Sequence, residues 1–179
     1  MKLTIKRATT EDAGVIGYIH SKVWVEEHKD IADPKIIAQM TPERRASRIA
    51  QNISNELWEY YLIKLDGVPI GFLVLGENKS DDSPDSNIGE ISALCIVNEH
   101  QNHGYEARTL DYAIERLLSQ GYQTIYFWID EGNISMQTML SAREFSFTGV
   151  TRSSFIGTFI THYRYEKHPE SIIINDDEF

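Results

Sequence analysis

Cysteine is almost absent from this sequence: Cys95 is the single example, so no internal disulfide can form. Long apolar runs are absent as well. The longest, such as residues 70–75, are far shorter than the roughly 20 residues that a membrane-spanning helix needs. Residues 1–6 have the pattern of a strand, and no apolar segment follows them, which argues against a signal peptide. We therefore predict a soluble, cytoplasmic protein with no membrane partner.

Positive charge is the other scarce component. The chain has 17 lysines and arginines against 27 aspartates and glutamates, which gives a formal net charge of -10. Such a surface repels nucleic acid phosphates and anionic lipids, so we predict no nucleic-acid partner. It is compatible with a cationic acceptor such as an amine, and equally with an acidic surface that serves only solubility.

The single cysteine stands inside the apolar run of residues 91–97. A lone cysteine can be a nucleophile, but one among apolar residues is more typical of a buried structural thiol. The six histidines are scattered and have no cluster of carboxylates or cysteines at ligand spacing, so no metal site is predicted.

The rest of the composition is that of one ordinary globular domain. The chain has 179 residues, of which 41% are hydrophobic and 25% are charged, close to the usual values. Apolar periodicity and turn residues predict the order β-α-α-β-β-β-α-β-α-β-β. The expected strands cover residues 4–7, 58–65, 68–75, 90–97, 122–129, 145–151 and 159–165, and the expected helices begin near residues 12, 42, 105 and 135. Residues 78–87 carry only polar side chains and one proline, which is typical of a solvated loop.

The most informative segment is the loop at residues 98–105, which joins an apolar strand to an amphipathic helix. Gly104 lies at the turn, and the first backbone N–H groups of a helix have no acceptor inside it. Together with the helix dipole, these groups form a site suited to an anion such as a pyrophosphate. An ordinary strand-to-helix loop is the alternative interpretation.

Gln101-Asn102-His103-Gly104 resembles the start of the acetyl-CoA pyrophosphate motif of the GNAT superfamily of N-acetyltransferases, Q/R-x-x-G-x-G/A. The resemblance extends over about residues 3–166, and the other matching positions are Ile96, residues 110–113, residues 120–122, Asn133 and Phe145. It implies an α+β fold with three layers, α/β/α, around a mixed and mostly antiparallel sheet. Residues 1–168 would form this domain, and residues 169–179 would form an acidic C-terminal tail. Family members often dimerise, which leaves a homodimer open.

The resemblance also implies acetyl-CoA as the cosubstrate, with its pantetheine arm along the strand that ends near Ile96. This strand is expected to run parallel to residues 122–129 and to splay away from them, because a crossover helix joins the two. The splay would leave backbone polar groups of Leu94, Ile96 and Val97 free for pantetheine. The residues implied in binding the cosubstrate are Leu94, Ile96, Val97, Gln101, Asn102, His103, Gly104, Tyr105, Glu106, Ala107 and Asn133.

Glu90 is the residue that the resemblance implies as the general base. An alkylamine has a pKa of about 10.4, so it must lose a proton before it can attack a thioester. Glu90 precedes Ile96 by the spacing of the strand glutamate found in some family members. Strand alternation would place Glu90, Ser92, Leu94 and Ile96 on one face. The alternative is a glutamate at the strand edge that faces water.

The acceptor pocket of the family lies near the first two helices, where this chain has Trp24, Glu26, Glu27 and His28. Trp24, Glu27 and His28 are therefore the predicted substrate-binding residues. Carboxylates beside an aromatic ring could hold a polyamine or another ammonium group through charge and cation–π contact. The alternative is a solvated helix end with one core tryptophan.

Four positions depart from the family pattern. Glu106 and Glu144 stand where the family has small residues, Leu140 replaces the tyrosine that protonates the departing thiolate, and Met136 replaces an alanine. We expect the Glu106 side chain to point to solvent, with Arg108 offsetting its charge. Three functions follow: acetyl transfer to a primary amine of a small molecule or peptide, a CoA-binding or interaction module with weakened catalysis, or a structural acidic domain with no CoA site.

Overall fold

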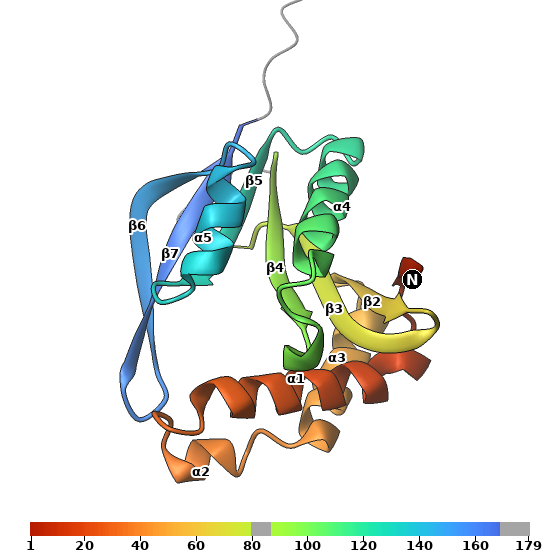
Figure 1. The fold of residues 1–179 in the computed structure, drawn as a ribbon, viewed down its shortest axis with the longest axis vertical. Helices are drawn as coiled ribbons and strands as arrows, with labels where there is room; N and C mark the ends of the chain where they lie inside the picture. The colour runs from red at the N-terminus through yellow and green to blue at the C-terminus, as the bar shows by residue number, and fades with distance from the viewer. Residues whose placement is uncertain (80–86, 169–179) are drawn as a thin grey trace, which may run out of the picture.

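A single seven-stranded sheet forms the centre of the molecule, in the order β1-β2-β3-β4-β5-β7-β6 (Figure 1). The computed structural model describes residues 1–79 and 87–168. The strands are β1 (Leu3–Arg7), β2 (Glu59–Leu65), β3 (Val68–Glu77), β4 (Ile88–Ile96), β5 (Thr124–Asp130), β6 (Ser146–Phe155) and β7 (Phe159–Lys167). Only the β4–β5 pair is parallel within this sheet, and the other pairs are antiparallel. The predicted α+β class with a mixed, mostly antiparallel sheet is confirmed.

The helices cover the sheet on both sides. They are α1 (Ala13–His28), α2 (Pro34–Ile37), α3 (Pro42–Ser54), α4 (Tyr105–Ser119) and α5 (Ile134–Ser141). The short α2 is absent from the sequence prediction, although Asp33 caps it and Pro34 occupies its first turn, a usual start signal. No helix in residues 1–79 and 87–168 combines the length and the apolarity needed to cross a bilayer. The predicted tail at 169–179 and most of the predicted loop at 78–87 lie outside the described residues.

Two hydrophobic clusters, one on each face of the sheet, define the layers. On β2, Tyr60 and Leu62 pack with residues of α1, such as Ile16, whereas Tyr61 and Ile63 pack in the cluster that contains α4 and α5. The period of two in strand side chains explains this division. Helices cover both faces of β2 and β3, and this explains why the two strands are apolar almost throughout.

Strands β4 and β5 separate within the sheet, as predicted. Their parallel pairing runs from Ile88 opposite Thr124 to Ile91 opposite Phe127, and then stops. Both strands continue beyond this point, β4 to Ile96 and β5 to Asp130. The two strand ends therefore leave a gap in the sheet.

A β-bulge at Ser92 accompanies the separation. Ile91 lies opposite Leu75 and Ala93 lies opposite Val74, so Ser92 is an extra residue on β4. The extra residue reverses the alternation of side chains along the strand. The prediction that Glu90, Ser92, Leu94 and Ile96 share one face is therefore wrong.

The two clusters show where each side chain of β4 points after the bulge. Ile91, Leu94 and Ile96 belong to the cluster with α4 and α5, and Ala93 and Cys95 pack against the cluster with α1. Glu90 precedes Ile91 directly and so points to the opposite, α1 side.

Candidate active site

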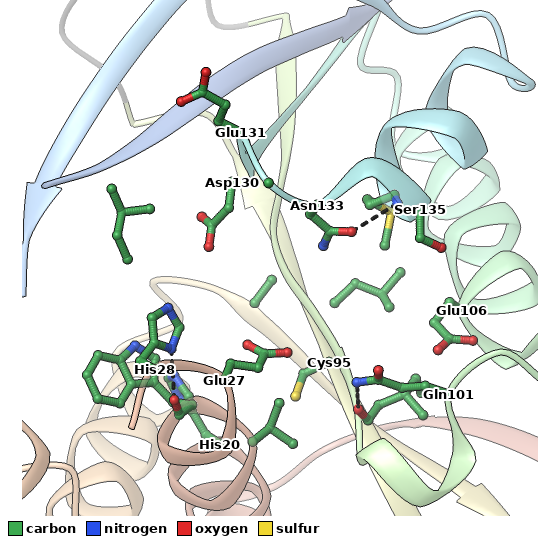
Figure 2. Close-up of a pocket in the computed structure, with 18 of the residues that line it drawn as sticks. His20, Glu27, His28, Cys95, Gln101, Glu106, Asp130, Glu131, Asn133 and Ser135 are labelled. Carbon is green, nitrogen blue, oxygen red and sulfur yellow. Dashed lines mark hydrogen bonds between the residues drawn. The ribbon is translucent and has the colours of Figure 1, made fainter. Parts of the chain in front are cut away.

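A cleft of about 850 Å³ opens where β4 leaves β5 (Figure 2). Its walls come from α1, the outer part of β4, the loop before α4, the end of β5 with the start of α5, and the β6–β7 hairpin. Nine predicted site residues line it, namely Trp24, Glu27, His28, Leu94, Ile96, Gln101, Asn102, Glu106 and Asn133. The fold thus brings predicted donor and acceptor residues into one space.

The other predicted residues lie outside the cleft lining. Glu90 is 8% exposed and sits opposite Tyr126, in the part of β4 that is still paired with β5. Val97 and Tyr105 pack in the core. The three remaining residues, His103, Gly104 and Ala107, belong to the turn that starts α4 and its first helical residues.

The N-terminus of α4 has the backbone geometry that suits an anion. Gly104 has a φ of 81° and precedes the helix, and the first backbone bond into it runs from the Arg108 N–H to the Gly104 carbonyl at 3.1 Å. The N–H groups of Tyr105, Glu106 and Ala107 come before that bond and have no helical acceptor. No heavy atom lies within 4 Å of the position that a Cβ would take at Gly104. The turn therefore offers free donors and open space.

The end of β4 is tied to this turn by a side chain. The Gln101 Nε2 donates to the Ile96 carbonyl at 2.9 Å and to the Asn98 Oδ1 at 3.0 Å. The Val97 N–H donates to the Ile70 carbonyl of β3 at 2.9 Å. The Ile96 carbonyl and the Val97 N–H are therefore already hydrogen-bonded, and the expectation that they are free for pantetheine is wrong. Because residues along an antiparallel strand alternate in direction, the backbone groups of Leu94 and the N–H of Ile96 point towards the gap, and the Ile96 carbonyl on that side is the one that Gln101 occupies.

Glu106 differs from its predicted orientation. Its carboxylate lines the cleft, and its Oε1 accepts from the Asn102 N–H at 3.4 Å (Figure 2). Asn102 itself has a φ of 61°, in the left-handed region. The carboxylate thus occupies a donor of the loop that would otherwise be open to an anion, and the prediction of a solvent-facing side chain is wrong.

On α5 and just after it, two departures from the family pattern, Leu140 and Glu144, have structural explanations, and the matching Asn133 has a structural role. Asn133 caps this helix, because its Oδ1 accepts from the Met136 N–H at 3.0 Å. Leu140 has no exposed surface and belongs to the core, so it can contribute only packing. Glu144 has a φ of 64°, the left-handed conformation that favours glycine after a helix, and it pairs with Lys167 at 2.8 Å.

The acceptor side of the cleft centres on the last turns of α1. The His28 Nδ1 is 2.8 Å from the Trp24 carbonyl oxygen, and the two rings stack at 4.5 Å. The Glu27 carboxylate points into the cleft from the same turn (Figure 2). Burial raises the pKa of Glu27, His28 partly opposes this, and the carboxylates of Asp130 and Glu26 raise it further. Such a carboxylate is a stronger proton acceptor than a fully hydrated one.

His20 and Cys95 also line the cleft, but neither is chemically poised there. Burial lowers the pKa of His20 to about 4, and Arg45 adds to this, so the ring is neutral near pH 7. Burial raises the pKa of the Cys95 thiol, and the charge of Glu27 raises it further. A thiol with a raised pKa is a poor nucleophile, in agreement with the structural interpretation of this cysteine.

Sequence reasoning missed the acidic pair at the end of β5. Asp130 and Glu131 line the cleft. The Asp130 Oδ1 lies 2.6 Å from the His162 Nδ1, and the Glu131 Oε1 accepts from the Tyr163 hydroxyl at 2.6 Å. The sequence does carry a signal for this pair. Two acidic residues follow an apolar strand, and ligands in such sheets bind at the carboxyl ends of parallel strands. None of the described residues that line the cleft is lysine or arginine.

Comparison with known proteins connects this fold to a family. The sequence model of the Acetyltransferase (GNAT) family matches residues 24–145. No curated protein matches the sequence significantly.

Solved structures with the same fold are similar at low identity. PaiA N-acetyltransferase from Thermoplasma acidophilum, in complex with coenzyme A, has a TM-score of 0.73 and 14% identity, covering 94% of this chain and 100% of that one. YncA, a putative acetyltransferase from Salmonella typhimurium with its cofactor acetyl-CoA, has a TM-score of 0.70 and 15% identity, covering 96% and 97%. The ribosomal-protein-S5-alanine acetyltransferase from Vibrio fischeri has a TM-score of 0.70 and 18% identity, covering 96% and 95%. Because the family model spans most of the chain, and the splayed strands and the open turn before α4 lie within it, this protein belongs to the GNAT acetyltransferase family.

Proposed function

We propose that this protein transfers the acetyl group of acetyl-CoA to a primary amine. One observation carries the proposal: the gap between β4 and β5 joins the open N-terminal turn of α4 to the Glu27 carboxylate in a single cleft. Family membership supports the same donor, as do the similar structures that hold coenzyme A or acetyl-CoA.

The donor half of the cleft fits this cosubstrate. The N–H groups at the start of α4 would hold the pyrophosphate, and the backbone groups of Leu94 and Ile96 that face the gap would hold the pantetheine arm. The side-chain amide nitrogen of Asn133 is available to the same arm, because its oxygen already caps α5. When bound there, acetyl-CoA would supply a thioester carbonyl close to the middle of the cleft.

On the acceptor side, Glu27 is our proposed general base. It accepts one proton from the amine as the nitrogen lone pair attacks the thioester carbonyl; the new C–N bond forms and the C–S bond breaks. The raised pKa of Glu27 brings it nearer to that of the amine. Glu90 remains the alternative base, but it is buried among paired strands and would need a relay to reach the cleft.

The departing thiolate has no tyrosine beside it, since no tyrosine is among the described residues that line the cleft. A thiol has a pKa of about 8.5, so the thiolate is a moderate leaving group even when water supplies its proton. The N–H groups of Leu94 and Ile96 could stabilise negative charge on the carbonyl oxygen. The proposed reaction is therefore feasible without an acid at position 140.

A second function is favoured by specific residues: a CoA-binding module without turnover. Leu140 is in the core, and Glu106 places a negative charge in the donor half. Calorimetric titration with acetyl-CoA, followed by a thiol-release assay over primary amines, separates the two. Binding with turnover supports the acetyltransferase, binding without turnover on any amine supports the module, and absence of binding rejects both.

A further inference from the structure

We propose that the acceptor is a monoamine joined to an apolar or aromatic group, and not a polyamine. This inference rests on the proposed acetyl transfer and deepens it. It follows from two independent features of the acceptor half: the number of carboxylates that have no hydrogen-bond partner, and an exposed apolar rim at the mouth of the cleft.

Among the described residues that line the acceptor half, one carboxylate, that of Glu27, is ready for a cation. Asp130 is engaged by His162 at 2.6 Å, and Glu131 accepts from the Tyr163 hydroxyl at 2.6 Å. Glu131 also points away from the middle of the cleft (Figure 2). Glu27, by contrast, has no hydrogen bond or ion pair with another described residue, although it is surrounded by cleft walls that raise its pKa. A second ammonium group would have to displace an existing partner, whereas a single one finds Glu27 open.

The rim of the cleft next to this carboxylate is apolar and exposed. Phe159 is 74% exposed and Ile31 is 50% exposed, and both line the cleft. Phe155 is 61% exposed and packs edge-on against Phe159 at 5.2 Å. Exposed apolar groups gathered at a cavity mouth are typical of a binding surface. A ring or branched alkyl group attached to the bound amine would cover them.

The rim is held in a fixed place. The Asp33 N–H, in the connection between α1 and α2, donates to the Ile156 carbonyl at the tip of the β6–β7 hairpin. Gly157 next to it has a φ of 112°, and a Cβ there would lie 2.5 Å from the Asp33 backbone nitrogen. The close contact fixes Phe159 and Ile31 on either side of one joint, so the surface exists before a substrate arrives.

Acceptor preference tests the proposal directly. We would measure kcat/KM for 2-phenylethylamine, ethylamine and 1,4-diaminobutane, each corrected for its deprotonated fraction. A single apolar group in a pocket changes kcat/KM by roughly 10-fold to 200-fold, so 2-phenylethylamine should exceed both others by about tenfold or more. A peptide with an N-terminal phenylalanine shows whether the same chemistry is also accepted from a chain terminus. Equal values, or preference for the diamine, would overturn the inference.

Variants locate the preference on the rim. Phe159→Ala should lower kcat/KM for 2-phenylethylamine about tenfold and that for ethylamine much less, and Phe159→Leu should restore part of it. Phe147→Ala is the matched control, since Phe147 is 44% exposed on the same hairpin but does not line the cleft. If Phe159→Ala keeps the preference and instead changes the oligomeric state in light scattering, the rim is an interface between copies and the inference fails.

The failure of this inference differs from failure of the proposed function. If ethylamine and the diamine are acetylated without any preference for the aromatic amine, acetyl transfer stands and only the acceptor class is wrong. If acetyl-CoA binds and no amine is acetylated, the proposed function itself fails.

Discussion

The two halves of the cleft are built in opposite ways. The donor half comes mostly from one continuous segment, residues 94–107, in which a strand, a turn and a helix follow each other. The acceptor half comes from α1, the end of β5 and the β6–β7 hairpin, which are far apart in the sequence. Local spacing therefore specifies the donor half, whereas only the packed fold assembles the acceptor half. If function follows the same division, changes in the acceptor half should alter turnover, acid stability or the KM for the amine. Changes in the donor half should alter the affinity for acetyl-CoA.

The largest expected effect is on the base. Glu27→Gln should lower turnover by about 10²-fold or more, because a positioned base contributes roughly 10²-fold to 10⁴-fold. Affinity for acetyl-CoA, measured by calorimetry, should stay unchanged because Glu27 lies in the acceptor half. In the wild type, kcat/KM should rise with pH through the pKa of Glu27, which burial raises from its ordinary value.

Glu90→Gln is the matched comparison for this variant. If Glu90→Gln lowers turnover as much as expected for Glu27→Gln, and Glu27→Gln has wild-type turnover, the base lies on β4 and the assignment is reversed. A loss of stability in Glu90→Gln is monitored by thermal unfolding, because this side chain is 8% exposed.

The next effect concerns the acid stability of the α1 wall. Burial holds the pKa of His20 at about 4 in the folded state, below its ordinary value of about 6.5. Between these values the unfolded state binds a proton that the folded state does not, so the free energy of unfolding falls as pH falls. The contribution is about 1.4 kcal/mol per pH unit, or about 3 kcal/mol across the window.

Chemical denaturation at several pH values from 7 to 4.5 measures it. The wild type should lose more stability than His20→Gln across this range. Parallel curves for the two proteins would show that His20 does not carry the difference.

A smaller effect is expected at the joint between the hairpin and α1. Gly157→Ala places a Cβ against the Asp33 backbone at a φ that side chains rarely adopt. Strain of this kind costs about 1–3 kcal/mol, and the hairpin should shift to relieve it. The KM for the amine should rise while acetyl-CoA affinity stays the same, as steady-state kinetics and calorimetry would show. Gly149→Ala is the control, because Gly149 is on the same hairpin with a φ of 80°, lies outside the cleft lining and has nothing within 4 Å of a Cβ. Equal effects of both changes on the amine KM would contradict a role for the contact between Gly157 and Asp33.

The smallest effect concerns the donor half. Glu106→Gly removes the carboxylate that accepts from the Asn102 N–H and lines the cleft. A repulsion of about 1 kcal/mol with a bound pyrophosphate corresponds to roughly fivefold in affinity. Acetyl-CoA should therefore bind about fivefold more tightly to the variant, and the gain should shrink as salt is raised. Affinities that are unchanged at every salt concentration would show that the carboxylate does not act on the donor.

The sequence alone determined the secondary elements, the sheet class and the position of the donor loop. These depend on local rules: the period of apolar residues, the Asp66-Gly67 turn, and the glycine before a helix start. The sequence did not predict the short helix α2 or the exact strand ends. Four residues carry too weak a period to identify a helix.

Tertiary structure decided which side chains meet. The bulge at Ser92 depends on the register with β3, and this one extra residue reversed the faces predicted for β4. The fold also brought Asp130, Glu131 and Phe159 into one cleft with Glu27, and it turned Glu106 into the cleft. No local pattern contains this information, because side-chain direction in a strand and distance between remote segments are fixed by neighbouring strands and packed helices.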